Sequence, residues 1–199
     1  MRRESPAVAR NRDPILNVLT ARLEDGWHVL ELASGSGEHA LYFSRALADR
    51  GIRWTPSDVD PDALASIRAW RRAGGPNLEE PIALDVHQSD WAGSFDAVFN
   101  ANLIHIAPWS VTEALFAGVR GVLRPHGRLL MYGPYRIDGA HTAPSNAQFE
   151  QWLKARDPRF GVRDLGEVEA VANTHGLVLV ERIPMPANNF VVVFGVNGP

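Results

Sequence analysis

The chain has 199 residues, of which 45% are hydrophobic and 22% are charged, as expected for one compact globular domain. It contains no cysteine, which excludes disulfides, zinc–thiolate sites, iron–sulfur clusters and a cysteine nucleophile. Twenty Lys and Arg against 23 Asp and Glu give a net charge of −3, without the basic excess of nucleic-acid-binding proteins.

The longest uninterrupted apolar stretch, residues 190–194, is far shorter than the roughly 20 residues of a membrane span. No apolar segment of the kind found in secretory signals follows the first arginines. We therefore expect a cytoplasmic protein with one domain over residues 1–199, and neither a nucleic acid nor a membrane as partner.

Short β-rich runs alternate with helix-period segments through the first two thirds of the chain, which indicates a parallel sheet covered on both faces. Strands are predicted at residues 28–32, 53–57, 81–85, 95–100 and 128–132, and a helix at 38–48. Asp60 before Pro61 predicts the start of a second helix, and Ser110 with Glu113 a capping box that starts a third. The buried face of the third helix should hold four apolar residues, Val111, Leu115, Val119 and Val122.

The last third has a different pattern. Residues 134–146 are predicted to form a long loop, followed by helices at 147–156 and 165–175, the second capped by Asp164. Strands at 177–183 and 190–196 are separated by only six residues, too few for a helical crossover, so they should form an antiparallel hairpin. The predicted fold is α/β and Rossmann-like, with a mostly parallel seven-stranded sheet closed by that hairpin.

An N-terminal arm, residues 1–13, is predicted to precede an amphipathic helix that begins near Pro14. Such an arm can cover an active site, and the alternative is a frayed terminus.

The first strand runs into a loop with two glycines, Gly35 and Gly37. Glycines allow a tight turn and a close approach to a ligand, and the helix N-terminus that follows offers free N–H groups. Asp58, 21 residues beyond Gly37, is expected at the end of the second strand, where a carboxylate can accept both hydroxyls of a ribose. Asp85 ends the third strand at the same edge. The alternative is an ordinary strand–helix turn.

Residues 35–40 (GSGEHA) also fit a dinucleotide-binding pattern, so NAD and S-adenosylmethionine (SAM) are both candidate ligands. The chain has no room for a separate substrate domain, and the antiparallel hairpin is foreign to the usual dinucleotide fold. Glu31, within the first strand, is awkward beside a pyrophosphate. These three features favour SAM, although Glu31 can equally be a buried structural carboxylate.

The stretches VLELASGSGEH, PSDVDP, LDV and LRPHGRLLMYGP resemble the successive motifs of class I SAM-dependent methyltransferases. More narrowly, SPAVARN, NANLIHIAPW, GPYRIDGAHTAPSN, RDPRFGVRD and MPANNF resemble a small methyltransferase-like family catalogued as a domain of unknown function, over nearly the whole chain. The resemblance implies SAM as cofactor and S-adenosylhomocysteine (SAH) as product. It places the methionine part of SAM among Glu31, Ala33, Ser34, Gly35 and Gly37, the ribose on Asp58, the adenine on Asp85 and Val86, and the far wall at Asn102.

Methyl transfer from SAM requires alignment of nucleophile, methyl and sulfur, and a base only where the nucleophile must lose a proton early. The predicted topology brings residues 100–109, 133–146 and 184–189 to the ligand-binding edge. His105 and His141 are candidate bases, and Tyr135 can orient the acceptor, although His105 lies between two isoleucines and can equally be a core residue. The candidate substrate-binding residues are Arg10, Asn11, Trp109, Asn146, Asn188 and Asn189, the last two being equally a turn signal.

These patterns lead to a SAM-dependent methyltransferase that acts on oxygen, nitrogen or sulfur of a small molecule, as a monomer or homodimer. No metal site is expected, and the Asn/Asp-Pro-Pro-aromatic signature of base- and glutamine-directed methyltransferases is missing. The alternatives are a SAM-binding protein of the same fold that does not methylate, and an NAD(P)-dependent oxidoreductase.

Overall fold

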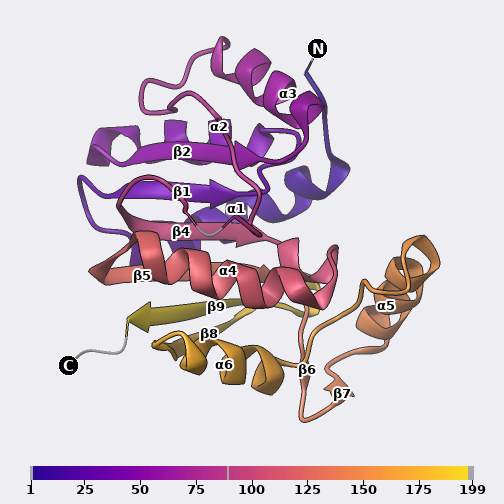
Figure 1. The fold of residues 1–199 in the computed structure, drawn as a ribbon. Helices are drawn as coiled ribbons and strands as arrows, with labels where there is room; N and C mark the ends of the chain where they lie inside the picture. Colours follow the sequence, from indigo (N-terminus) through magenta and orange to yellow (C-terminus); the bar gives the residue numbers. More distant parts are fainter. Residues whose placement is uncertain (1, 89, 197–199) are drawn as a thin grey trace. The chain divides into compact units, whose positions relative to one another are not determined.

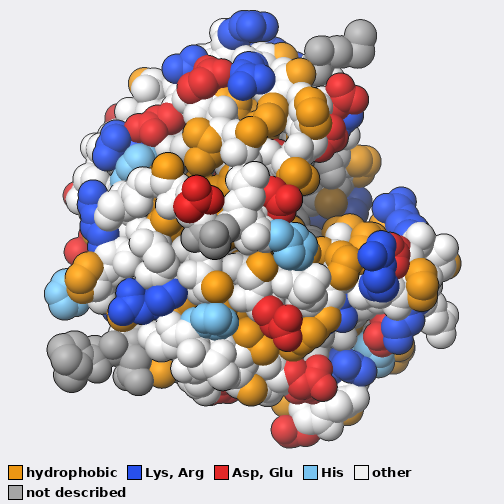
Figure 2. Space-filling model, in the orientation of Figure 1, with side chains coloured by type: hydrophobic (Ala, Val, Ile, Leu, Met, Phe, Trp, Pro, Cys, Tyr) orange, Lys and Arg blue, Asp and Glu red, His pale blue; other side chains and the backbone are white. Residues whose placement is uncertain are grey.

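The computed structural model describes residues 2–88 and 90–196, which divide into two compact units. The first unit comprises residues 2–85 and 94–100, and the second the described residues of 86–93 and 101–196. None of the helices in the described residues has the length and apolarity that a membrane span requires. Lys, Arg, Asp and Glu side chains are intermixed on the face shown in Figure 2, in keeping with the small net charge.

The first unit contains four parallel strands in the order β3-β2-β1-β4, of which β2, β1 and β4 are labelled in Figure 1. Its elements are α1 (Pro6–Arg22), β1 (His28–Leu32), α2 (Glu38–Ala46), a 3₁₀ turn (Ala48–Arg50), β2 (Arg53–Asp58), α3 (Pro61–Arg71), β3 (Ile82–Ala83) and β4 (Phe95–Ala101), whose last residue belongs to the second unit. Strand β1 is buried from Val29 to Leu32, as expected of a central parallel strand covered on both faces.

Three aromatic rings from different elements form the centre of the first unit's core. Phe43 of α2 packs against Trp54 of β2 and Phe99 of β4, with ring centroids 5.5 and 5.7 Å apart. All three side chains are fully buried. These contacts fix α2, and with it the loop that precedes it, against two strands.

The N-terminal helix starts earlier than predicted. Helix α1 begins at Pro6, not near Pro14, so residues 6–13 of the predicted arm are helical. Proline suits the first turn of a helix because its missing N–H would have no partner there. The buried face of α1 consists of Val8, Ile15 and Leu19, so this face begins before Pro14. The burial of these side chains offsets the loss of the backbone hydrogen bond that Pro14 cannot make.

The second unit contains the antiparallel part of the sheet. Its elements are a 3₁₀ turn (Leu103–His105), α4 (Trp109–Val122), β5 (Leu123–Gly133), β6 (Arg136–Ile137), β7 (Ala140–His141), α5 (Pro144–Arg156), α6 (Leu165–Thr174), β8 (Leu177–Met185), a 3₁₀ turn (Pro186–Asn188) and β9 (Asn189–Val196). Strand β9 lies antiparallel between β5 and β8 (Figure 1), which confirms the predicted hairpin. The order of the seven-stranded sheet is β3-β2-β1-β4-β5-β9-β8, and the predicted fold class is confirmed.

The predicted capping box of the third helix is wrong. Helix α4 begins at Trp109 with Pro108 as N-cap, so Ser110 lies within the first turn, its Oγ 3.2 Å from His87 Nε2. The proline, with φ fixed at −59°, already turns the chain into the helix. The predicted apolar face is confirmed, because all four residues are buried: Val111, Leu115, Val119 and Val122.

The predicted loop at residues 134–146 contains regular structure instead. Strands β6 and β7 form a small hairpin around Asp138 and Gly139, both with positive φ (51° and 77°). An Asp-Gly pair with two left-handed residues is the favoured two-residue hairpin turn. Helix α5 begins at Pro144, three residues before the predicted start, because proline again occupies the first turn.

Several other boundaries differ by a few residues. Helix α2 ends at Ala46 rather than at residue 48, and β3 covers only 82–83 of the predicted 81–85. Strand β5 extends over 123–133 instead of 128–132, continuing directly from α4. The helix cap predicted at Asp60 is confirmed, because its Oδ1 accepts from the Asp62 N–H at 2.9 Å.

Candidate functional site

The loop between β1 and α2 is a sharp turn held against the end of β2. Three of its five residues have positive φ: Ala33 (51°), Gly35 (57°) and Gly37 (87°). Ser34 N–H donates to the Ser57 carbonyl at 2.8 Å, which ties the loop to β2. The loop is therefore a fixed feature of the first unit.

The two glycines of this loop have different surroundings. A Cβ added to Gly37 would lie 2.8 Å from Ile67 Cα, so this glycine allows α3 to pack against the start of α2. A Cβ on Gly35 would meet nothing nearer than the Ala33 carbonyl oxygen at 3.9 Å. Packing thus accounts for Gly37, whereas Gly35 faces open space that a ligand can enter.

Asp58 lies at the end of β2 and contacts the glycine loop. Its Oδ2 accepts from Gly35 N–H and its Oδ1 from Asp60 N–H, each at 2.9 Å. The side chain is buried among these contacts. A carboxylate oxygen has two lone pairs, so both oxygens retain the capacity to accept from ribose hydroxyls. The structure brings Asp58 and Gly35 together, as the sequence predicts.

Glu31 is a buried carboxylate in the middle of the core. Its Oε2 accepts from Trp54 Nε1–H at 2.8 Å. Burial raises the pKa of Glu31 to about 7, and the negative charge of Asp58 acts in the same direction. This contact supports the structural interpretation of Glu31 that the sequence left open.

Three further predicted cofactor residues follow the ends of β3 and β4. Asp85 is half-buried, two residues beyond β3, and belongs to the first unit. Val86 and Asn102 belong to the second unit. Asn102 has φ +61°, and its N–H donates to the Tyr132 carbonyl at 2.8 Å, so it forms the turn after β4. The cofactor contacts of all three stay predictions.

The first described residues lie beside the glycine loop through Arg3 and Ser5, two residues that were not among the predicted site residues. Arg3 N–H donates to Ser66 Oγ at 2.8 Å, and that hydroxyl donates to the Ser36 carbonyl at 2.7 Å. Arg3 also pairs with Asp60 at 2.9 Å, and Ser5 N–H donates to Glu38. No local sequence pattern predicts contacts over some 60 residues.

The predicted substrate residues in this region have contrasting environments. Arg10 is exposed. Asn11 Oδ1 lies 2.8 Å from Nε2 of His39, whose pKa is lowered to about 4 by burial and by the charge of Arg12. At neutral pH the ring is therefore neutral, and its N–H donates to Asn11. This hydrogen bond between Asn11 and His39 connects α1 to α2.

In the second unit, His105 and Tyr135 lie together, as predicted. Their rings are 5.0 Å apart and nearly perpendicular, and both side chains are fully buried. His105 Nδ1 accepts from Arg163 N–H at 3.4 Å, while His105 Nε2 and the Tyr135 hydroxyl have no hydrogen-bond partner in the described part of the chain.

Burial affects the ionisation of both groups. Together with the charge of Arg163, it lowers the pKa of His105 to about 3, and it raises the pKa of Tyr135. At neutral pH both groups are uncharged. The pair therefore presents two buried polar atoms, His105 Nε2 and the Tyr135 hydroxyl, that have no partner among the described residues.

His141 is paired with a residue that sequence reasoning did not select. Its Nε2 lies 2.7 Å from Glu150 Oε2, and Lys154 Nζ lies 2.9 Å from Glu150 Oε1. Glu150 contacts His141 because the β6–β7 hairpin folds toward α5, and the sequence does not predict that arrangement. The i, i+4 spacing of Glu150 and Lys154 does indicate a charged pair on one helix face.

The predicted asparagines tie α5 to the turn between β8 and β9. Asn146 Nδ2 donates to the Asn188 carbonyl at 2.9 Å, and Asn188 Nδ2 donates to Ser145 Oγ at 3.2 Å. Asn189 Nδ2 donates to the Pro186 carbonyl at 3.2 Å. These contacts support the turn interpretation of Asn188 and Asn189. The ring of Trp109 faces the Arg163 guanidinium, 5.5 Å away.

A family profile decides what the chain belongs to. The profile DUF938, described as protein of unknown function, matches residues 2–195. This chain is a member of the DUF938 family. The match confirms the resemblance to a methyltransferase-like family of unknown function.

Solved structures are similar to this DUF938 protein in fold, and three of them each cover 96% of its chain. They include the SAM-dependent methyltransferase SibL in its apo form (20% identity, TM-score 0.79, 55% of that chain covered) and an O-methyltransferase family protein from Burkholderia thailandensis (16%, 0.79, 58%). A third is CalO1, a methyltransferase in calicheamicin biosynthesis with SAH bound (15%, 0.77, 55%). The DUF938 chain spans somewhat more than half the length of these structures, and at this identity the likeness establishes the fold.

Proposed function

We propose that this protein is a SAM-dependent methyltransferase that methylates oxygen, nitrogen or sulfur of a small molecule. The observation that carries the proposal is the contact between Asp58 at the end of β2 and the backbone of Gly35. It places a carboxylate with spare lone pairs beside a glycine that faces open space, in a fold shared with SAM-dependent methyltransferases.

The residues of the first unit fit this cofactor. When bound, SAM supplies a methyl group activated by its sulfonium. Asp58 would accept from the ribose hydroxyls, and the open side of Gly35 would admit the methionine part. Glu31, Ala33, Ser34 and Gly37 would complete the wall of that pocket, with Asp85 at the adenine.

His105 and Tyr135 would position the acceptor. The low pKa of His105 opposes its predicted role as a base in the free protein. Its Nε2 and the Tyr135 hydroxyl are instead two buried polar atoms that a polar group of the acceptor would satisfy. An acceptor that is already deprotonated, such as a thiolate or an ionised phenol, suits this pair best.

The same low pKa keeps a second candidate function open, a SAM-binding protein that does not methylate. An assay with methyl-labelled SAM and separate sets of phenols, amines and thiols discriminates between the two. The methyltransferase proposal predicts turnover with one set, reduced at least about tenfold in His105→Ala and Tyr135→Phe with SAH affinity unchanged. SAH binding without methyl transfer to any set would favour the second candidate.

A further inference from the structure

A second pair of unpartnered polar atoms lies on the β6–β7 hairpin. Arg136 and His141 are directly opposite each other in its ladder, so their side chains extend from the same face with Cβ atoms about 4.5–5.5 Å apart. Arg136 Nε and His141 Nδ1 are both buried and have no hydrogen-bond partner among the described residues. Buried polar atoms are normally paired, so two neighbouring exceptions indicate a ligand.

The other nitrogen of the His141 ring is held firmly. Glu150 Oε2 lies 2.7 Å from His141 Nε2, and Lys154 holds the second carboxylate oxygen at 2.9 Å. A Cβ added to Gly161 would lie 3.1 Å from Glu150 Oε1, so the carboxylate is closely packed on that side as well. Glu150 therefore fixes the orientation of the ring and leaves Nδ1 for another partner.

The carboxylates near this pair already have other partners. The charge of Arg136 acts on Glu150, but the two oxygens of that carboxylate contact His141 and Lys154. The nearby Asp164 carboxylate accepts instead from Gly139 N–H at 2.7 Å and Gly166 N–H at 2.9 Å. The positive charge of Arg136 thus lacks a carboxylate of its own within the described contacts.

We propose that Arg136 and His141 bind an anionic oxygen group, a carboxylate or a phosphate, of a small-molecule ligand. A guanidinium matches both groups through parallel N–H···O bonds that include Nε–H. His141 Nδ1 donates to either anion when the ring is charged, and when the ring is neutral it accepts from the O–H of a hydrogen phosphate. That this ligand is the methyl acceptor rests on the proposed function, whereas the binding itself does not.

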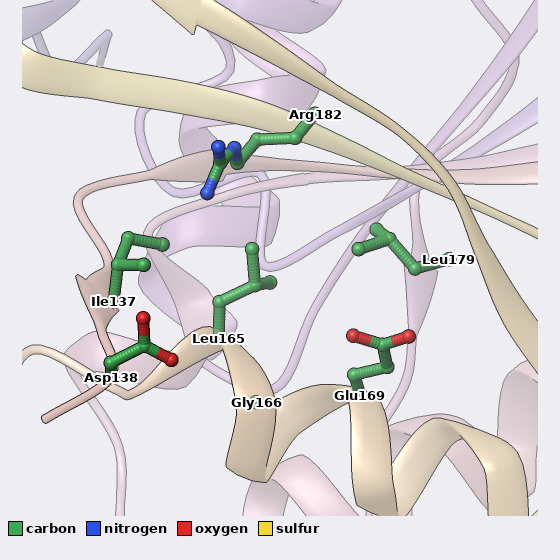
Figure 3. A pocket seen from close by; sticks show the side chains of 7 residues that line it. All are labelled: Ile137, Asp138, Leu165, Gly166, Glu169, Leu179 and Arg182. Atoms are coloured by element: carbon green, nitrogen blue, oxygen red, sulfur yellow. The ribbon is translucent and has the colours of Figure 1, made fainter.

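An open groove elsewhere in the second unit is a weaker candidate. It has a volume of about 380 Å³ and lies between the β6–β7 turn, α6 and β8 (Figure 3). Asp138, Glu169 and Arg182 all point into it in Figure 3, so charges of both signs share the space. No single ligand chemistry follows from such a lining, but Arg182 supplies a matched control for Arg136.

The test is a titration of ¹⁵N-labelled full-length protein with inorganic phosphate and, separately, with acetate, each to about 20 mM. We expect the Arg136 Nε–H and His141 ring resonances to shift saturably with at least one of the two anions. Saturation by phosphate alone would identify a phosphorylated ligand, and saturation by acetate a carboxylate. Shifts that grow linearly, or that spread over surface residues, would overturn the proposal.

Variants complete the experiment. Arg136→Gln should weaken anion binding at least tenfold, and Arg136→Lys, which keeps the charge but lacks Nε–H, should also weaken it. Arg182→Gln should have no effect, and equal affinities in all three variants would contradict the proposal. Calorimetry with SAH on the same samples separates the anion-binding proposal from the proposed methyltransferase function. If the protein binds SAH but neither anion, only the anion-binding proposal is overturned.

Discussion

At the residue scale, Gly37 is the position of the candidate cofactor loop that least tolerates a side chain. In Gly37→Ala the new methyl would lie 2.8 Å from the Ile67 backbone, at a φ of +87° that L-residues rarely adopt. We expect the free energy of unfolding to fall by roughly 2–4 kcal/mol in urea denaturation, because both overpacking and backbone strain contribute.

Gly35→Ala is the matched control for this substitution. It has a similar positive φ of +57°, but no atom lies within 3.9 Å of the added methyl. The loss of stability should be limited to the backbone strain of about 1–2 kcal/mol. Equal losses in the two variants would show that α3 does not pack on the loop as described.

Glu31 gives a prediction about pH. Because its pKa rises from 4.5 in its ordinary state to about 7 in the fold, the native protein retains a proton between these values that the unfolded chain has lost. This group's contribution to stability is therefore present below pH 4.5 and is lost as the pH rises to 7.

The variant Glu31→Gln removes this dependence and retains an acceptor for Trp54 Nε1–H. Relative to the wild type, it should gain stability between pH 4.5 and 7, by up to about 3 kcal/mol. Denaturant unfolding of both proteins at several pH values measures the difference between their free energies of unfolding. The contributions of the buried histidines are the same in both proteins and cancel in this difference. A constant difference over this range would mean that Glu31 is ionised in the fold at acidic pH.

The site residues differ in how far the sequence could predict them. Asp58 and Gly35 were predictable because strand ends and glycine turns have local signals, and parallel strands bring these signals to one edge. The pairing of His141 with Glu150 was not predictable, because it depends on how the hairpin of β6 and β7, two strands of two residues each, folds back on α5.

At the element scale, Pro14 interrupts the hydrogen bonding of α1. It has no N–H to donate to the carbonyl four residues earlier, at Arg10. Pro14→Ala should raise the free energy of unfolding by roughly 1–3 kcal/mol, since an interior proline costs a helix about 3 kcal/mol. Thermal and urea denaturation measure the change. A decrease would indicate that the proline ring itself contributes packing that alanine cannot replace.

The elements themselves were predicted best where chain length limits the options. Six residues between two strands cannot hold a crossover, and β8 and β9 are indeed antiparallel. The start of α1 and the β6–β7 hairpin were missed for different reasons. The polar residues 10–13 hid the apolar face of α1, and strands of two residues show no alternation of polar and apolar side chains.

At the scale of the whole molecule, the fold class with its C-terminal antiparallel hairpin and the family were predictable from the sequence, and the acceptor was not. The fold class follows from the alternation of strands and helices, and the family from motifs spread along the chain. In the proposed function the acceptor contacts buried groups, His105 Nε2 and the Tyr135 hydroxyl, and only the folded chain reveals that these groups are buried.

Calorimetric titration with SAH measures whether the loop between β1 and α2, together with Asp58, binds SAM. We expect micromolar binding to the wild type, weakened at least about tenfold in Asp58→Ala, because hydrogen bonds to a charged group are lost. NAD, titrated in parallel, should not bind. Equal SAH affinity in the two proteins, no SAH binding to either, or binding of NAD that Asp58→Ala weakens would contradict SAM binding at this site.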